Sequence, residues 1–547
     1  MTQARRILNS EFAVAGAVVL AATLAVTWPL GRHLTDRLSG HWDSFFGAWR
    51  LAWIADAAGS PDLHLFNAPI FYPEPRALAF SDAILLPGLV AAPLRFAGLS
   101  PMTVYNLALF AAFVTSGLAM FVLARFLSGR GDAALIAAVI YTLAPYRLDH
   151  LDHFEMQMAM WMPIALWLWH RAVDGGTARH AAGAVGAAAC QWLSCIYYGL
   201  LFAPVFAVGI LVEWGTVARG RRRQVVGGLA AAAAAGAIVI GIYSLPYLAN
   251  RQQTGDRQLQ DIARYSATLG SYLAVHPHNA LYGRLLTSSG EFETRLFPGA
   301  LAIVLAAAGL AFGPWTRRRW AYLAMAVLAF DLSLGANGLL FPALRDVLVP
   351  YRGLRAPARA GMLVLLVVAV LAGYGAAAIL SRLANRRTAA AFTTLCLLLL
   401  IVEYRNAPDL WEGPGAPDVP QLGLVRGSVV LEMPIATPER LDRSVDAYYM
   451  LNRVGAWPSL VNGYSGYHPT DYITMAERVR LFPDDRAIRE IARIGVTVLT
   501  VHERWYGPPR YKEIVASLDA RPDVEQIGKY ADHGQGVAVY HVKPLKD

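Results

Sequence analysis

Two carboxylates bracket the first long polar stretch of the chain, and they are the first residues whose type and setting could do chemistry. Asp43 lies in HWDSFFGAW, among Trp and Phe side chains, and Asp82 ends FYPEPRALAFSD. A carboxylate in a partly apolar setting can act as a base near neutral pH. Each acid also precedes an apolar run, so each could instead cap a helix. For Asp43, residue type alone favours the cap.

A second polar cluster is the segment RLDHLDHFEMQ, residues 147–157. Its Asp and His residues recur at i and i+3, so each pair could share one face of a helix. Such pairs could ligate a divalent metal. A metal is not favoured, because no Cys or further His lies nearby and the HExxH spacing is missing. We expect these side chains to hydrogen-bond a polar substrate or to mark a membrane interface. The candidate binding residues are Arg147, His150, His153, Glu155 and Gln157.

A third cluster places three Arg residues in YRGLRAPAR: Arg352, Arg355 and Arg359. A guanidinium group binds phosphate through two parallel hydrogen bonds. A lipid phosphate or diphosphate at the membrane surface is therefore the expected ligand. Anchoring to anionic head groups, or pairing with acids on the same side, explains the cluster equally well.

The elements that must position these clusters are membrane helices. The chain has 547 residues, of which 56% are hydrophobic and 16% charged, whereas soluble globular chains carry about 25% charged residues. The apolar runs predict about eleven spans that alternate across a bilayer. The first is expected to be a retained helix and not a cleaved signal peptide. The predicted spans are residues 11–30, 104–127, 133–145, 156–169, 181–195, 198–214, 225–248, 298–312, 320–334, 362–383 and 389–404.

Arg residues gather in every second loop, as in ARGRRRQ. This bias places the N-terminus in the cytoplasm and the C-terminus outside, and it explains the net charge of +9 without nucleic acid. All three clusters then face the outside. The three Cys residues all lie in apolar runs and suggest neither a metal site nor a disulfide framework.

Residues 1–404 are thus predicted to be a transmembrane domain with a first outer loop at 32–100. In that loop, residues 43–57 suit a helix lying in the membrane interface. Residues 84–96 are too short to span and suit a re-entrant or juxtamembrane helix. After the Pro/Gly linker EGPGAPDVPQ, residues 405–547 predict a soluble α/β or α+β domain. Its expected strands are 428–435, 496–502 and 536–542, and its expected helices are 441–454, 471–482, 484–495 and 511–520.

The chain resembles the GT-C superfamily of membrane glycosyltransferases, which includes the protein mannosyltransferases and the lipid A aminoarabinose transferases. The resemblance rests on HWDSFFGAW, LFNAPIFYPEP, LAPYRLDHLDHFEMQMAMWMPIAL, YRGLRAPARAG and LVNGYSGYHP, and it spans most of the chain. Asp43 stands where the family has its first-loop catalytic acid. Asp82 or Glu74 is similar in position to the family's second acid. The chain departs from the family in lacking a DD, DE or ExD doublet in this loop.

The resemblance implies an inverting glycosyltransferase of the bacterial cytoplasmic membrane. The donor would be a sugar linked to polyprenyl phosphate, and the acceptor an extracytoplasmic glycan, lipid or protein. Asp43 would deprotonate the acceptor hydroxyl, while Arg355 and Arg359 would stabilise the departing lipid phosphate. Asp82, His150 and His153 would position sugar and acceptor. No nucleotide is needed; no cofactor is certain, and a divalent metal is possible but not favoured.

A non-catalytic alternative is a lipid or polysaccharide transporter, or a cell-envelope assembly factor, with the same fold. Transporters usually carry ionisable residues within their spans. Here the mid-span positions are nearly all apolar, which favours surface chemistry. A sensor with an outer binding domain is a weaker alternative. If the enzyme hypothesis holds, Asp43, Asp82, His150 and Arg355 should line one outer cavity.

Overall fold

The computed structural model describes residues 2–40, 42–286, 291–406, 408–414, 427–436 and 445–544. His41, most of the EGPGAPDVPQ linker and residues 441–444 of the predicted helix 441–454 lie outside these ranges. The chain divides into two compact units. The helical unit comprises residues 1–33, 107–244 and 256–409, and the mixed unit comprises residues 34–106, 245–255 and 410–547.

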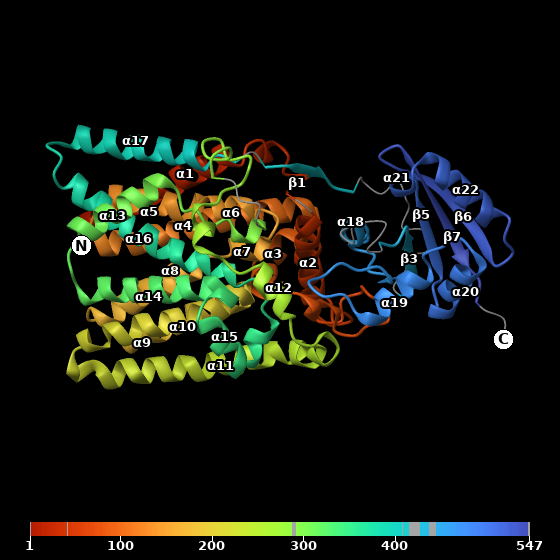
Figure 1. The fold of residues 1–547 in the computed structure, drawn as a ribbon, viewed down its shortest axis with the longest axis horizontal. Helices are drawn as coiled ribbons and strands as arrows, with labels where there is room; N and C mark the ends of the chain where they lie inside the picture. The colour runs from red at the N-terminus through yellow and green to blue at the C-terminus, as the bar shows by residue number, and fades with distance from the viewer. Residues whose placement is uncertain are drawn as a thin grey trace. The chain divides into compact units, whose positions relative to one another are not determined.

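The long helices run alongside one another as a bundle (Figure 1), and each of the eleven predicted spans coincides with one of them. They are α1 (Thr2–Val26), α4 (Pro101–Ser128), α5 (Gly131–Leu143), α8 (Trp161–Val173), α9 (Ala178–Ser194), α10 (Ile196–Glu213), α11 (Arg222–Thr254), α13 (Ala300–Phe312), α14 (Arg317–Leu334), α16 (Gly361–Leu380) and α17 (Arg386–Tyr404). The fourth starts five residues later than predicted, because the chain leaves the helical conformation after Gln157.

Six helices in the described part of the chain are long and apolar enough to cross a membrane: residues 101–128, 196–216, 219–254, 317–337, 357–380 and 386–404. Three shorter helices, Ser10–Val26, Leu85–Phe96 and Ala300–Phe312, are also apolar. The chain is therefore a multi-pass membrane protein. The number of eleven crossings and the side on which each terminus lies stay predictions.

Two glycines let α13 and α16 pack closely within the helical unit. A Cβ atom on Gly309 would collide with the backbone carbonyl of Leu371, and one on Gly375 would collide with that of Leu305. Such close approach of two backbones is typical of small residues at helix interfaces in membranes. It brings the starts of both helices, and the short segments before them, to one end of the bundle.

Short elements follow or precede the long helices of the helical unit. They are α6 (Pro145–Asp149), α7 (Phe154–Gln157), α12 (Leu259–Arg264), α15 (Leu340–Val347), and the 3₁₀ turns η5 (Leu269–Leu273), η6 (Phe292–Thr294), η8 (Val349–Gly353) and η9 (Pro357–Ala360). The predicted candidate residues of this unit lie on or next to these segments, so the bundle acts as a frame for them.

The mixed unit combines the first long loop with the C-terminal part of the chain. Its elements are β1 (Arg37–Ser39), α2 (Trp42–Gly59), α3 (Leu85–Phe96), β2 (Leu410–Glu412), β3 (Val429–Met433), α18 (Val445–Asn452), β4 (Ser459–Leu460), α19 (Thr470–Arg478), α20 (Asp485–Ile494), β5 (Val498–His502), α21 (Glu503–Tyr506), α22 (Pro508–Asp519), β6 (Val524–Asp532) and β7 (Gln535–Val542). A two-stranded antiparallel sheet, β1 with β2, ties the loop to the C-terminal segment.

A five-stranded sheet in the order β4-β3-β5-β7-β6 forms the centre of the C-terminal part (Figure 1). Strands β3, β4 and β5 are parallel, and β7 runs antiparallel to β5 and β6. The predicted strands and helices of this region are all present. Strand β6 was not predicted, because VEQIGKYAD is an edge strand with mostly half-exposed or exposed side chains and no apolar alternation.

Helix α2 differs from the prediction in its surroundings. A helix lying in a membrane interface keeps one polar face open. In the structure α2 is buried on nearly all sides from Trp42 to Ala55, and even its Arg50 side chain is only 2% exposed. The reason is that α3 and α18 of the same unit both pack against it. The expected α3 is present as a short helix.

Candidate active site

Asp43 is the second residue of α2, so it lies inside the first turn and is not the N-cap. A carboxylate is favoured there, because the N-terminal end of a helix carries a partial positive charge. Its Oδ1 accepts a hydrogen bond of 2.8 Å from the hydroxyl of Tyr464, 421 residues further along the chain. Asp43 is thus an ordered acid at the start of a buried helix.

Asp82 is not the N-cap of α3, because that position is Ile84, but it lies two residues before it and supports the turn into the helix. Its Oδ1 accepts a hydrogen bond of 3.1 Å from the backbone N–H of Ile84, just before α3 begins. Its backbone carbonyl accepts a hydrogen bond of 2.6 Å from Arg50 of α2. Arg50 lies seven residues after Asp43, about 10 Å along the helix. Both acids therefore border α2, at different heights, and their catalytic roles stay predictions.

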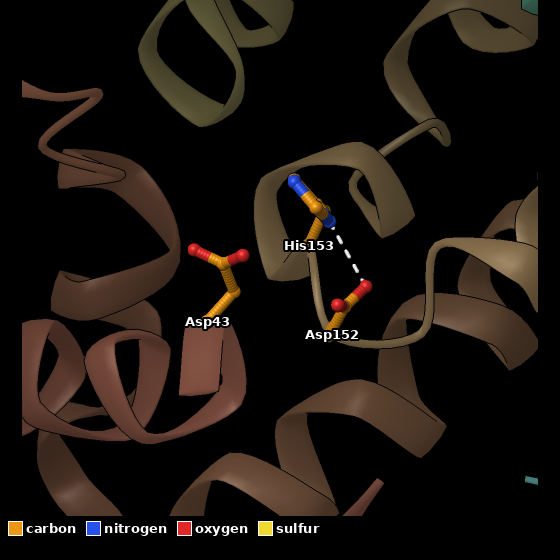
Figure 2. A group of neighbouring side chains, drawn as sticks. All are labelled: Asp43, Asp152 and His153. Atoms are coloured by element: carbon orange, nitrogen blue, oxygen red, sulfur yellow. Dashed lines mark hydrogen bonds and ion pairs between the residues drawn. The ribbon is translucent and has the colours of Figure 1, made fainter. Parts of the chain in front are cut away.

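The DHLDHFE segment is not one helix, so the predicted i, i+3 faces are wrong. It forms the end of α6, a turn, and the start of α7. The turn nevertheless brings His150 and His153 together, with ring centroids 5.6 Å apart. Figure 2 shows the adjacent pair, in which His153 Nδ1 lies 2.9 Å from Asp152 Oδ1. An imidazole nitrogen and a carboxylate oxygen are ligand types that divalent metals accept.

A buried charge network connects three segments of the helical unit. Arg359 of η9 donates from Nε to both oxygens of Glu293 in η6, at 3.1 Å each. Nε2 of His150 lies 3.2 Å from Glu293 Oε2. Glu293 and His150 are fully buried and Arg359 is 4% exposed. Burial by itself would raise the pKa of Glu293, but Arg359 and His150 outweigh it and hold that pKa well below its usual range.

Arg147 is buried in an unusual setting. Its guanidinium lies over the ring of Phe113, 4.6 Å from the centroid, and donates to the backbone carbonyl of Gln157 at 2.9 Å. The Gln157 amide donates in turn to the carbonyls of Arg147 and His150. Burial lowers the pKa of Arg147 to about 10, so the side chain stays charged at neutral pH. These bonds join α6, the turn and α7 into one piece.

Glu155 and Asp149 complete the acids of this segment. Glu155 is the second residue of α7 and is 8% exposed. Asp149 accepts a hydrogen bond of 2.9 Å from the Asn406 side chain, while Arg295 lies 3.9 Å away. Burial outweighs Arg295 and raises the pKa of Asp149 to about 8.

The three Arg residues of YRGLRAPAR have different surroundings. Arg359 is held by Glu293, as described above. Arg352 donates to the backbone carbonyls of Arg345 and Asp346 at the end of α15, at 3.1 and 2.9 Å. Arg355 is half-buried and its guanidinium lies over the ring of Tyr265, 5.0 Å from the centroid. Within the described part of the chain, Arg355 has no carboxylate partner.

The structure therefore groups the predicted residues within each unit. His150 and Arg359 share Glu293, Arg147 and Gln157 are bonded to each other, and Arg355 lies nearby in sequence on the same unit. Asp43 and Asp82 both border α2 in the mixed unit. That all of them line one cavity stays a prediction. Two important partners, Glu293 and Tyr464, were not among the predicted site residues, although Tyr464 lies in the LVNGYSGYHP motif.

Comparisons with known proteins identify the fold. No family model matches the chain, and no curated protein matches it in sequence. Several solved structures are similar, among them the following three. The archaeal oligosaccharyltransferase AglB of Archaeoglobus fulgidus, in complex with an inhibitory peptide and a dolichol-phosphate, is 13% identical with a TM-score of 0.50, over 90% of this chain and 69% of that one. The apo form of the Archaeoglobus fulgidus oligosaccharyltransferase is 11% identical with a TM-score of 0.52, over 91% and 70%.

ArnT from Cupriavidus metallidurans in the apo state is 14% identical with a TM-score of 0.50, and the match covers 98% of both chains. These three structures are GT-C membrane glycosyltransferases. The chain thus has the fold of this class, as the sequence motifs predicted. At such low identity the likeness concerns the fold, and the chemistry must be argued from the residues of this chain.

Proposed function

We propose that the protein is a membrane glycosyltransferase that takes its sugar from a polyprenyl-phosphate donor and transfers it to an extracytoplasmic glycan, lipid or protein. The observation that carries the proposal is Asp43, an ordered carboxylate in the first turn of α2. Its carboxylate is held by the side chain of Tyr464, which lies 421 residues further along the chain in the same unit. The GT-C fold supplies the setting in which such an acid acts as a base.

In the proposed reaction, Asp43 takes the proton of an acceptor hydroxyl as that oxygen attacks the anomeric carbon of the sugar. The bond between this carbon and the donor phosphate oxygen breaks, and its electron pair leaves with the polyprenyl phosphate. The configuration at the anomeric carbon is inverted. General base catalysis of this kind typically contributes about 10²–10⁴-fold in rate.

Arg355 is the residue that we assign to the departing phosphate. A guanidinium over an aromatic ring remains able to bind an anion through its edge. Of the three predicted Arg residues, Arg359 is already neutralised by Glu293 and Arg352 already caps α15. Arg355 is also held by its backbone, because the Tyr197 hydroxyl accepts a hydrogen bond of 2.9 Å from its N–H.

The other predicted residues are assigned supporting roles. Asp82 holds the start of α3 against α2, while His150, Arg147 and Gln157 hold the α6–α7 segment in shape. His153 and Glu155 remain candidates for contacts to sugar or acceptor. We also propose that this segment and the mixed unit face the outside of the bacterial cytoplasmic membrane, with the N-terminus inside. Reporter fusions at both termini test that orientation.

Asp43→Asn in the full-length protein tests the base. Sugar transfer is measured in membranes with a panel of polyprenyl-phosphate sugars, with and without Mg²⁺ or Mn²⁺, because Asp152 and His153 offer two ligand atoms. We expect a loss of about 10²-fold or more. Asp56→Asn is the matched control, since Asp56 lies on the same helix and accepts a hydrogen bond from Trp457. Full activity of Asp43→Asn would falsify the assignment. If the wild type transfers no sugar from any donor, the transporter or assembly-factor alternative is favoured.

A further inference from the structure

We propose that Tyr464 is a positioning residue for Asp43, so that the C-terminal part of the chain orients the base of the reaction. The inference rests on the proposed function only in taking Asp43 as the base. It gives a role to the C-terminal sheet and to the LVNGYSGYHP segment, which the sequence left without one.

The Tyr464 side chain is fixed against α2 at two points. Its hydroxyl donates to Asp43 Oδ1 at 2.8 Å. Its ring meets the ring of Phe46 edge-on, with centroids 5.6 Å apart and an interplanar angle of 81°. Phe46 lies one turn after Asp43 on α2 and is 3% exposed. Tyr464 therefore packs against the first turn of α2, and its hydroxyl holds one carboxylate oxygen of Asp43 in a fixed direction.

The backbone that carries Tyr464 is anchored in the sheet. The buried Asn462 accepts a hydrogen bond of 2.7 Å from the N–H of Glu432 in β3, and its amide donates to the Glu432 carbonyl and to Asp446. At Gly463 a side chain would collide with the ring of Phe71, so this glycine permits the close packing. Tyr464 is thus only two residues from a core polar anchor, and its position is set by the sheet.

The first long loop is bonded to the same segment. The backbone N–H groups of Phe71 and Tyr72 donate to the carbonyls of Asn462 and Leu460, at 3.2 and 3.0 Å. The N–H of Leu460 donates back to the carbonyl of Pro69 at 3.1 Å. Further along α2, Trp457 donates to Asp56. Helix α2 is consequently held by the C-terminal part at both its first and its later turns.

Proton transfer to Asp43 requires that its carboxylate be held in one orientation. A carboxylate on a single-bonded side chain rotates, and only some orientations point an oxygen at an acceptor hydroxyl. A hydrogen bond to one oxygen fixes the rotation and hence the direction of the other oxygen. Loss of this alignment reduces the rate of the chemical step, and a misplacement of about 1 Å can cost about 10²-fold. Donor binding by the rest of the site is not affected.

The test is Tyr464→Phe in the full-length protein, which removes one hydroxyl and keeps the ring on Phe46. We expect kcat for transfer from a polyprenyl-phosphate sugar to fall by about tenfold to a hundredfold, with KM for the donor unchanged. Tyr540→Phe is the matched control, because the hydroxyl of Tyr540 also donates to an aspartate, Asp519, at the end of α22. Unchanged kcat in Tyr464→Phe, or an equal fall in Tyr540→Phe, would overturn the proposal.

A double-mutant cycle separates this proposal from the proposed function. If Tyr464 acts through Asp43, adding Tyr464→Phe to Asp43→Asn should cause no further loss of activity. A loss of full size in the double variant shows that Tyr464 acts elsewhere and overturns the positioning role. An active Asp43→Asn protein overturns the assignment of the base itself. All variants are compared at equal amounts of folded protein, judged by thermal unfolding in detergent.

Discussion

Arg359 is bound to the buried Glu293, so we expect it to have a structural role and not to bind a ligand. Removing either partner of this pair should destabilise the helical unit. Both side chains are almost fully buried, and the guanidinium contacts both carboxylate oxygens. Breaking a buried pair by removing one partner costs about 3–5 kcal/mol, because the other charge stays in a medium of low polarity. In a chain of 547 residues the melting temperature should fall by about 3–4 °C.

Glu293→Gln and Arg359→Gln should not destabilise the protein equally. Glu293→Gln leaves the Arg359 guanidinium, which cannot lose its proton. Arg359→Gln leaves the Glu293 carboxyl with His150 as its remaining partner. Without Arg359, burial favours the neutral form of this carboxyl more strongly, so it can take up a proton more easily. We therefore expect Glu293→Gln to be the more destabilising, and the destabilisation by Arg359→Gln to shrink at acidic pH. The double variant, with no buried charge left, should recover part of the stability.

The assay is thermal unfolding of purified protein in detergent between pH 5 and 8, with donor binding measured at a temperature where all variants are folded. Arg355→Gln is the control, since Arg355 pairs with no carboxylate within the described residues. It should leave the melting temperature unchanged and weaken donor binding. The reasoning is refuted if Arg359→Gln keeps its melting temperature and loses donor binding, because Arg359 would then be the phosphate ligand that the sequence suggested.

Two further predictions concern other buried acids. The folded chain holds a proton on Asp149 up to a pKa of about 8, whereas the ordinary value is 3.8, so stability should fall as the pH rises through that window, by at most about 1.4 kcal/mol per pH unit. Asp149→Asn should make the melting temperature less dependent on pH between pH 6 and 9. An unchanged pH dependence would contradict this prediction. Burial opposes ionisation of Glu432, but Arg453 and His502 prevail and hold its pKa at about 2, so its contribution is present above about pH 4.5 and lost as the pH falls toward 2. Glu432→Gln should cost about 3 kcal/mol or more by leaving Arg453 buried. Glu513→Gln is the control, because the Glu513 side chain is 66% exposed beside Arg510, and it should cost less than about 1 kcal/mol. An equal loss of melting temperature in both variants would contradict this prediction.

The sequence predicted the helices well because their cause is local. A run of apolar residues needs no partner to be recognised, so every predicted span coincides with a helix. The break at Met158, between α7 and α8, was missed because it depends on hydrogen bonds from elsewhere, including that of Gln191 to the Met158 carbonyl. Likewise, strand β6 is specified by its pairing with β7 through the turn at His533 and Gly534, both with positive φ, and not by its own apolar pattern.

The candidate residues were found by type, but their partners could not be. Nothing near Arg359 in the sequence indicates that Glu293, 66 residues earlier, neutralises it. By residue type, the three arginines of YRGLRAPAR are equally good candidates for binding phosphate. In the structure they differ, because each has different contacts. The general reason is that a charge in an apolar setting must be compensated, and the compensating group is chosen by the fold and not by proximity in sequence.

Asp43 in the first loop is another residue whose role depends on a partner distant in sequence. An acid that follows a membrane helix could be a cap, a surface residue or a base, and sequence cannot separate these. The hydrogen bond from Tyr464 to Asp43 argues against a simple helix cap, because a cap needs no hydroxyl from a segment distant in sequence. Helix α2 shares its unit with the C-terminal sheet, and segments next to that sheet are bonded to Asp43 in its first turn and to Asp56 near its end. A substitution in the sheet that displaces Asn462 should therefore act on Asp43, and the C-terminal part of the chain is better regarded as half of the site's scaffold than as an appended domain.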